Sequence, residues 1–498
     1  MDLQPALLWR YFDDLSRIPR GSGNESGVRS YIHRFAEANA FDFVEDEAGN
    51  CVVSVPGRGA GLASDPVIIQ SHMDMVCVCD QEHADHDFTR DPIRTRVTQW
   101  TEKGRTREVM MGTGTTLGAD NGMGLVAALA VASDPDVKDR PPLELLFTVE
   151  EETGLIGAQK LAPSLLRADL LINLDSEELG EICVSCAGGR DLMADWTVNR
   201  GAVPALNVPM VVSVSGLPGG HSGVQIHERR GNAIVSLLRT LLAVPGVERG
   251  IGLASLEGGS ARNVIPGACT AAIWTSETLA PAIERAFNDP ALREAIQSEV
   301  DEDVPGSITC GAKRLGVSGL QPPIAPSETL AILSAIAAIP NGVQHWSKVI
   351  DGLVETSNNV AVLGTTETNI HLQCSTRSSL DGAIEAFQDE ALPGLEASGA
   401  RVRVGDGYPG WPADPDNPLL RLAEQTFEAI LGHAPRITAI HAGLECGVLK
   451  GKRPSVQMIS FGPDIFGAHT VNERVAIDSV PTFYACLTGL LRDLCTAG

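Results

Sequence analysis

Residues 118–132 read GADNGMGLVAALAVA, and this stretch is the starting point for assigning the fold. Its closely spaced glycines are typical of a turn. The apolar run from Leu125 to Ala132 predicts a buried helix that follows the turn. Asp120 would therefore lie at the N-terminal end of this helix.

Three apolar runs around this stretch predict buried strands that end in polar residues. Short apolar runs alternate with helical stretches from residue 1 to about 187, which indicates an α/β domain with a largely parallel sheet. In such sheets, functional sites form beyond the C-terminal ends of the strands. The runs are PVIIQ at 66–70, LELLFTV at 143–149 and ADLLINL at 168–174.

The length of 498 residues exceeds what one hydrophobic core normally serves, so more than one domain is expected. Strand, loop and helix units over 188–403 predict an inserted α+β domain. Residues 1–187 and 404–498 would then form one discontinuous main domain. A similar order of strand and helix in 210–242 and 369–397 suggests that the insert has two related halves.

Charge and composition exclude several classes of protein. The 63 acidic and 38 basic residues give a formal net charge of −25, which repels phosphate backbones and anionic lipids. The N-terminal segment carries acid where a secretion signal needs basic charge, and the apolar runs are too short to span a bilayer. We expect a soluble, cytoplasmic protein with no nucleic-acid or membrane partner, whose eleven scattered cysteines are thiols.

Histidine and acidic residues follow the predicted strands. His72 and Asp74 share a face at a strand end, so the carboxylate can lie behind the imidazole and fix its tautomer. Asp120 lies among glycines that allow close approach, and a carboxylate can bridge two cations. The simpler alternatives are an exposed loop histidine and an aspartate that caps a helix.

The remaining candidates follow the same pattern. Glu151 and Glu152 belong to a run of three glutamates after the 143–149 strand, and a cation there would offset their mutual repulsion. Asp175 follows the 168–174 strand, and His469 comes much later in the chain. Nitrogen and oxygen ligands of this kind suit zinc, with manganese or cobalt as possible substitutes.

In this order, the motifs resemble those of the co-catalytic zinc peptidases, and specifically of the aminoacyl-histidine (Xaa-His) dipeptidases. The resemblance covers nearly the whole chain and implies a zinc-peptidase catalytic domain with an inserted lid domain. Longer strings that carry it are HDFTRDPI at 86–93, GTTLGADNG at 114–122, YPGW at 408–411 and HAGLECG at 441–447.

The resemblance implies two Zn²⁺ ions per chain. One ion would be held by His72 and Asp175 and the other by Glu152 and His469, with Asp120 bridging both. A cis peptide bond is also implied between Asp120 and the residue that follows it.

Three further residues acquire catalytic roles by the resemblance. Glu151 would be the general base, although a shift of one position within the glutamate run would exchange roles. Asp74 would orient His72, and His221 in the lid domain would donate a hydrogen bond to the tetrahedral intermediate. Closure of the lid would complete the site.

The same resemblance implies contacts with a small peptide substrate. Arg377 would bind the terminal carboxylate, for which a guanidinium is suited. Asn263 and Gly443 would contact the peptide, and Glu445 would recognise the free amine. The protein would act as a monomer or a homodimer.

We therefore predict metal-dependent hydrolysis of unblocked dipeptides of the Xaa-His type, including carnosine-like substrates. The alternatives within the superfamily are an N-acyl-amino-acid amidohydrolase and a tripeptidase. A non-catalytic metal- or peptide-binding protein is the alternative from another class, and it has no need of Glu151, Asp74 or His221.

Overall fold

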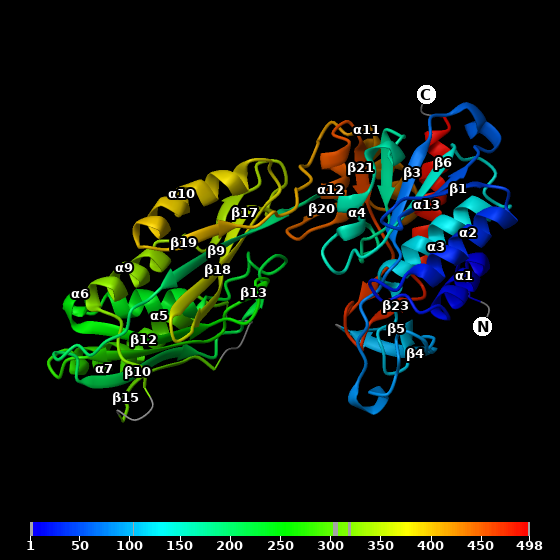
Figure 1. The fold of residues 1–498 in the computed structure, drawn as a ribbon. Coiled ribbons are helices and arrows are strands. Elements are labelled where there is room, and N and C mark those ends of the chain that lie inside the picture. The colour runs from blue at the N-terminus through cyan, green and yellow to red at the C-terminus, as the bar shows by residue number, and fades with distance from the viewer. Residues whose placement is uncertain (1–2, 103, 302–306, 317–319, 497–498) are drawn as a thin grey trace. The chain divides into compact units, whose positions relative to one another are not determined.

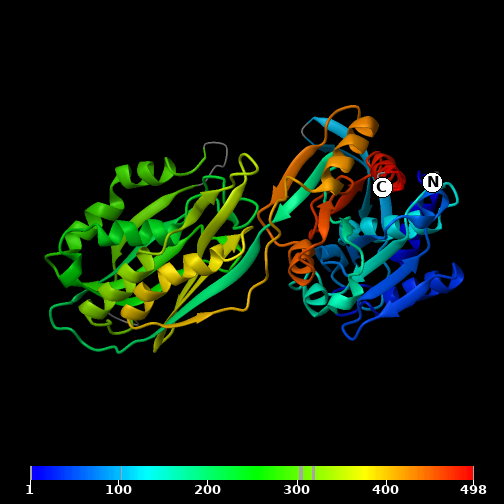
Figure 2. The same ribbon diagram turned by 90° about the horizontal axis from the view of Figure 1, so that it is seen from above.

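The chain forms two compact units. The computed structural model describes residues 3–102, 104–301, 307–316 and 320–496. Unit 1 comprises Met1–Ser185, Ala413–Ala439 and Leu444–Gly498, and unit 2 comprises Cys186–Pro412 and Ile440–Gly443. In Figures 1 and 2, the orange and red C-terminal elements of unit 1 lie among its blue and cyan elements.

An eight-stranded sheet forms the centre of unit 1. Its inner strands β6, β3, β7 and β21 run parallel, whereas β1 and β2 on one side and β8 on the other pair in antiparallel fashion. This arrangement confirms the predicted α/β class with a largely parallel sheet, and the three predicted strands are β3, β6 and β7. In sheet order the strands are β1 (Asp42–Glu45), β2 (Cys51–Val55), β6 (Leu143–Thr148), β3 (Val67–His72), β7 (Leu170–Asn173), β21 (Gln457–Ser460), β8 (Glu181–Cys186) and β20 (Arg436–Ile440).

The predicted buried helix is α3 (Ala119–Ser133), which packs on β3 and β6 and against α1. Every residue from Asn121 to Ala132 is buried, because the helix has small and aliphatic side chains on all sides. The other helices of unit 1 are α1 (Ala6–Ser16), α2 (Ser26–Ala38), α4 (Ile156–Lys160), α11 (Pro418–Leu431), α12 (Glu445–Lys452) and α13 (Val480–Leu494).

Unit 1 also contains a four-stranded antiparallel sheet that joins distant segments of the chain. Its strands are β22 (Ile465–Phe466), β23 (Arg474–Ala476), β5 (Arg105–Gly112) and β4 (Thr95–Glu102). The loop between β22 and β23 contains His469, so this sheet fixes both ends of a segment that carries a predicted metal ligand.

Unit 2 is built on a nine-stranded sheet whose recorded strand pairs are all antiparallel. Its strands are β15 (Thr309–Arg314), β10 (Val208–Ser215), β14 (Cys269–Thr275), β12 (Ile251–Gly258), β17 (Val354–Thr365), β18 (Asn369–Ser378), β9 (Gly188–Thr197) and β19 (Arg401–Val404), with β16 (Gly342–Trp346) beside β17. The accompanying helices are α5 (Ala233–Leu242), α6 (Val247–Gly250), α7 (Ala280–Asn288), α8 (Pro290–Gln297), α9 (Pro326–Ala337) and α10 (Ala383–Ala397), and the small pair of strands is β11 (Gly220–His221) with β13 (Val264–Ile265).

The large sheet of unit 2 consists of two halves with the same topology. One half runs β10, α5, β12, β14, α7, β15, and its sheet order is β15-β10-β14-β12. The other runs β9, α9, β17, β18, α10, β19, and its strands follow the same order in the reverse direction along the sheet, β17-β18-β9-β19. Each half is therefore a βαββαβ unit of the ferredoxin-like kind.

The equivalences between the halves differ from the expected ones. The sequence pairs residues 210–242 with 369–397, whereas the topology pairs β10 with β9, and β18 with β14. The physical reason is that the whole first half is inserted between β9 and the rest of the second half. Adjacent strand and helix segments are therefore not the repeating element.

The boundaries of the units also differ in detail from the expected ones near 188 and 404. Residues 440–443 return to unit 2 although their neighbours on both sides belong to unit 1. Among the residues that the structure describes, no helix is both long and apolar enough to cross a membrane.

The burial of α3 predicts a large effect on stability. Leu129 has no exposed surface, so Leu129→Ala should destabilise the protein by about 2–5 kcal/mol through the cavity it leaves. The matched control is Leu62→Ala, because Leu62 is 70% exposed and its truncation should cost less than about 0.5 kcal/mol. Urea unfolding followed by circular dichroism measures both midpoints, and equal midpoints would contradict the prediction.

Candidate metal centre

The five predicted ligands lie in unit 1 at or beyond the C-terminal ends of parallel strands. His72 is the last residue of β3, and Asp175 follows β7. Glu152 comes shortly after β6, and Asp120 lies in the first turn of α3. His469 reaches the same place from the loop between β22 and β23.

Asp120 lies between two imidazoles. Its Oδ1 is 3.1 Å from His72 Nε2, and its Oδ2 is 3.1 Å from His469 Nε2. Ligand atoms of His72, Asp120 and Glu152 all lie within 4.8 Å of one another. The peptide bond between Asp120 and Asn121 is cis, as expected.

Each imidazole also faces a second carboxylate. His72 Nε2 is 3.4 Å from Asp175 Oδ1, and His469 Nε2 is 3.0 Å from Glu152 Oε2. The arrangement therefore contains two groups of one nitrogen and two carboxylates that share Asp120. Nitrogen and oxygen donors in this combination fit zinc.

The electrostatics of this group also favour cations. Burial and the neighbouring carboxylates raise the pKa of Asp175 to about 6, and hydrogen bonds to Asp120 and Glu152 raise the pKa of His469 to about 11. Burial raises the pKa of Glu177, two residues after Asp175, to about 8. Glu152 Oε1 is buried without a hydrogen-bond partner in the described part of the chain. The residues thus fit a group of positive charge at this place.

Asp74 lies on the other side of His72. Its Oδ1 is 3.3 Å from His72 Nδ1, and it accepts hydrogen bonds from Ser22 Oγ at 2.7 Å and from the amides of Glu151 at 3.1 Å and Glu152 at 3.2 Å. Burial opposes its ionisation, but the His72 and Ser22 contacts lower the pKa of Asp74 to about 2. An ionised Asp74 can orient the imidazole and hold the glutamate loop.

The glutamate run has a defined register in the structure. Glu152 faces His469, as stated above, whereas the carboxyl group of Glu151 interacts electrostatically with His72, Asp175 and Glu445. Burial raises the pKa of Glu151 well above its ordinary value. A raised pKa makes the carboxylate form of Glu151 a stronger base.

His221 lies in unit 2 on β11, and its tautomer can be assigned from its contacts. Nδ1 accepts hydrogen bonds from the amides of Gly223 at 3.1 Å and Val224 at 3.2 Å, so the proton of the neutral ring is on Nε2. Burial and the charge of Arg377 lower the pKa of His221. A neutral ring with an available Nε2–H is a hydrogen-bond donor.

Other predicted substrate contacts of unit 2 form a cluster. Arg377 is 7% exposed and donates from Nη1 to Tyr408 Oη at 3.0 Å. Gly443 lies against the Tyr408 ring, where a Cβ would approach to 2.8 Å. His441 is held by Ser357 Oγ at 2.7 Å from Nε2, and burial together with the Arg377 charge lowers the pKa of His441 to about 3.

Two further predicted substrate contacts, Asn263 and Glu445, form hydrogen bonds with residues other than those of this cluster. Asn263 is exposed, and its carbonyl accepts a hydrogen bond from the Ser222 amide at 2.8 Å. Glu445 has no exposed surface, and its Oε2 accepts from Gln70 Nε2 and Thr148 Oγ1, both at 2.6 Å. This burial against the sheet disfavours the expected contact between Glu445 and a substrate amine.

Arg20 and Glu473 are not among the residues predicted from the sequence, and both are buried beside the Asp120 turn. One signal was available: Gly118 is the N-cap residue of α3 and has no side chain, so the helix amides need an acceptor from elsewhere. The sequence does not show which acidic residue supplies it.

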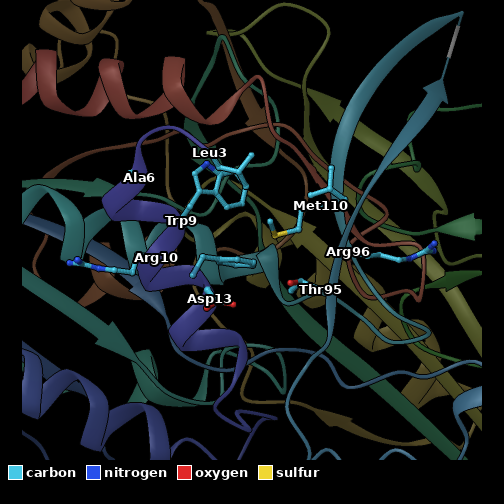
Figure 3. A pocket seen from close by; sticks show the side chains of 10 residues that line it. Leu3, Ala6, Trp9, Arg10, Asp13, Thr95, Arg96 and Met110 are labelled. Carbon is cyan, nitrogen blue, oxygen red and sulfur yellow. The ribbon is translucent and has the colours of Figure 1, made fainter. Parts of the chain in front are cut away.

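A cavity of about 430 Å³ lies at helix α1 and strands β4 and β5. Figure 3 shows three of the residues that line it, which are Trp9 of α1, Arg96 of β4 and Met110 of β5. None of the predicted ligands lines this cavity. Asp175, Glu177 and His469, whose pKa values are raised, lie around Asp120 instead, which favours that group as the candidate site.

Comparisons with known proteins give matches over most or all of the chain. The sequence model of peptidase family M20/M25/M40 matches residues 68–493. The cytosol non-specific dipeptidase of Escherichia coli (strain K12) is 36% identical over 502 residues, covering 99% of this chain and 98% of the relative. The crystal structure of aminoacylhistidine dipeptidase from Vibrio alginolyticus has a TM-score of 0.88 at 34% identity and covers 99% of this chain and 97% of that chain. A tripeptidase from Staphylococcus aureus shares the fold, with a TM-score of 0.55 at 16% identity and 99% coverage of both chains.

The burial of Glu445 predicts a pH-dependent contribution to stability. Its pKa is raised by burial to about 7, so it stabilises the fold fully below the ordinary glutamate value, and this contribution is lost as pH rises through about 7. Glu445→Gln removes the ionisation. As the pH rises from about 5 to about 8, the free energy of unfolding of the variant should increase by about 1 kcal/mol or more relative to that of the parent protein. Urea unfolding of both metal-free proteins tests this, and parallel pH profiles would contradict it.

Proposed function

Because this chain belongs to peptidase family M20/M25/M40, we propose that it is a metal-dependent dipeptidase that hydrolyses unblocked dipeptides. Family membership confirms the resemblance predicted from the sequence motifs. The observation that carries the proposal is the Asp120 carboxylate, which directs one oxygen to each of two imidazoles. The Escherichia coli relative, which is named a dipeptidase, matches the chain over almost its whole length.

We propose that the cofactor is a pair of Zn²⁺ ions. His72 and Asp175 would hold one ion, Glu152 and His469 the other, and Asp120 would bridge them. Two such ions, when bound, would acidify a water molecule and polarise the scissile carbonyl. Mn²⁺ or Co²⁺ could replace zinc, because ligands of this type discriminate poorly between these ions.

Glu151 is the proposed general base. Its amide donates a hydrogen bond to Asp74 at 3.1 Å, and burial raises the pKa of its carboxyl group, which makes the carboxylate a stronger base. It would take a proton at its carboxylate and deliver it to the nitrogen of the leaving amine. Asp74 would keep His72 in the required orientation through its contact with Nδ1.

The proposed substrate contacts come from unit 2. His221 would donate its Nε2–H to the negative charge that develops on the substrate carbonyl oxygen. Arg377 would bind the terminal carboxylate, since its Nε is buried without a partner among the described residues. Asn263 and Gly443 remain proposed contacts with the peptide.

The finer substrate class in this proposal is Xaa-His, including carnosine-like dipeptides. The Vibrio alginolyticus relative is named for aminoacylhistidine, and it matches the chain over nearly its whole length. We also propose a cytosolic location, because the Escherichia coli relative is named for the cytosol. Either a monomer or a homodimer fits the proposal.

The function is tested with purified protein and a set of peptides. Unblocked β-Ala-His and several α-dipeptides should be cleaved, while N-acetylated and C-amidated versions should not. A strong chelator should abolish cleavage, and added Zn²⁺ should restore it. Cleavage of N-acylated amino acids alone would indicate an amidohydrolase, preference for tripeptides a tripeptidase, and no turnover despite bound zinc a binding protein.

The role of Glu151 predicts a selective loss of turnover. Glu151→Gln should lower kcat by about 10²–10⁴-fold, because the variant has no base of the required strength. Its zinc content should equal that of the parent protein, because Glu151 is not a proposed ligand. Glu150→Gln is the matched control and should keep most of the activity. If Glu150→Gln were the inactive variant, the general base would be Glu150 and not Glu151.

A further inference from the structure

Glu473 makes an unusual set of contacts with the turn that carries Asp120. Its Oε2 accepts hydrogen bonds from the amides of Leu117 at 2.8 Å and Gly118 at 2.9 Å. Its Oε1 accepts from the amides of Ala119 at 2.6 Å and Asp120 at 3.2 Å. The side chain is 2% exposed, so one buried carboxylate accepts from four consecutive amides.

Arg20 binds the carbonyl groups of the same region. Its guanidinium donates to the carbonyl oxygens of Met73 at 3.0 Å and Asp74 at 2.9 Å, and also to that of Gly118. Gly118 has a φ of 72°, and a Cβ there would collide with the Arg20 guanidinium. The Asp120 turn is thus held through its amides by Glu473 and through a carbonyl by Arg20.

These contacts connect the three segments that carry the two imidazoles and the shared carboxylate. Arg20 binds the chain just after His72 and also the turn before Asp120. Glu473 lies four residues after His469, and its own amide donates to the Thr470 carbonyl at 3.0 Å. Glu473 therefore connects the His469 loop to the Asp120 turn.

We propose that Glu473 and Arg20 are positioning residues that hold the Asp120 turn, so that each oxygen of Asp120 stays directed at one imidazole. This inference rests on the proposed role of Asp120 as the bridging metal ligand. Neither side chain is a proposed ligand, and both act through backbone groups.

Simple helix capping does not account for the arrangement. A cap needs one short polar side chain at the helix start, whereas here a carboxylate from a distant segment accepts from four amides. Burying a carboxylate and a guanidinium also carries a desolvation cost that an uncharged cap would avoid. The Glu473 carboxylate and the Arg20 guanidinium both bind the backbone of the turn that carries Asp120, so they restrain its position.

Glu473→Gln is the informative variant because it preserves shape. A glutamine side chain has one acceptor oxygen, and its NH₂ group cannot accept from the other pair of amides. Glu144→Gln is the matched control, since Glu144 is 6% exposed and accepts from the amides of Arg167 and Ala168 at the opposite end of β6. The same chemical change is thus made at two buried carboxylates of unit 1.

Two measurements are made on each full-length protein. Competition with a chromophoric chelator gives the Zn²⁺ affinity, which should fall by about 10–100-fold in Glu473→Gln and stay unchanged in Glu144→Gln. Hydrogen exchange of the metal-free proteins should show faster exchange of the amides at 117–120 in Glu473→Gln alone. Arg20→Lys, which keeps the charge and loses the planar fork, should also weaken Zn²⁺ binding.

Unchanged Zn²⁺ affinity in Glu473→Gln, or an equal loss in Glu144→Gln, would overturn the inference. If Glu473→Gln does not fold, wild-type affinity in Arg20→Lys would overturn it in the same way. A parent protein that binds Zn²⁺ and cleaves no peptide would refute the proposed function, while the affinity differences between variants would still support the positioning role.

Discussion

The group around Asp120 depends on one electrostatic constraint: several carboxylates share a small, mostly buried volume at the edge of a sheet. The same carboxylates raise the pKa of His469, because positive charge at this place offsets part of their negative charge. Each oxygen of Asp120 faces a different imidazole, so small movements of its turn would affect both sides. The surrounding structure has to hold this turn more firmly than an ordinary loop.

The parallel sheet of unit 1 meets this requirement by bringing strand ends together. β3, β6 and β7 lie side by side and end at the same edge, where the acidic residues follow. The loop with His469 is held at both of its ends by the four-stranded sheet. Proposed ligands far apart in the sequence thus meet because strand pairing fixes the segments that carry them.

The sequence predicts the local part of this arrangement well. The strands at 67–72, 143–148 and 170–173 and the helix at 119–133 follow from runs of apolar residues, and four of the five proposed ligands lie within these elements or just beyond them. Glu473 and Arg20 could not be predicted, because their partners are backbone groups of distant segments. The burial of Glu445 and the interrupted repeat of unit 2 depend on tertiary packing, which one sequence without its fold does not reveal.

The position of β21 has a consequence for synthesis on the ribosome. This strand comes from residues 457–460 and lies between β7 and β8, both of which are made much earlier. Until the C-terminal segment emerges, β7 and β8 present unpaired edges, which favour aggregation. Unit 2 has nearly all of its residues before 413, so it can acquire most of its structure first. Unit 1 therefore cannot complete its eight-stranded sheet until the last segment has been translated.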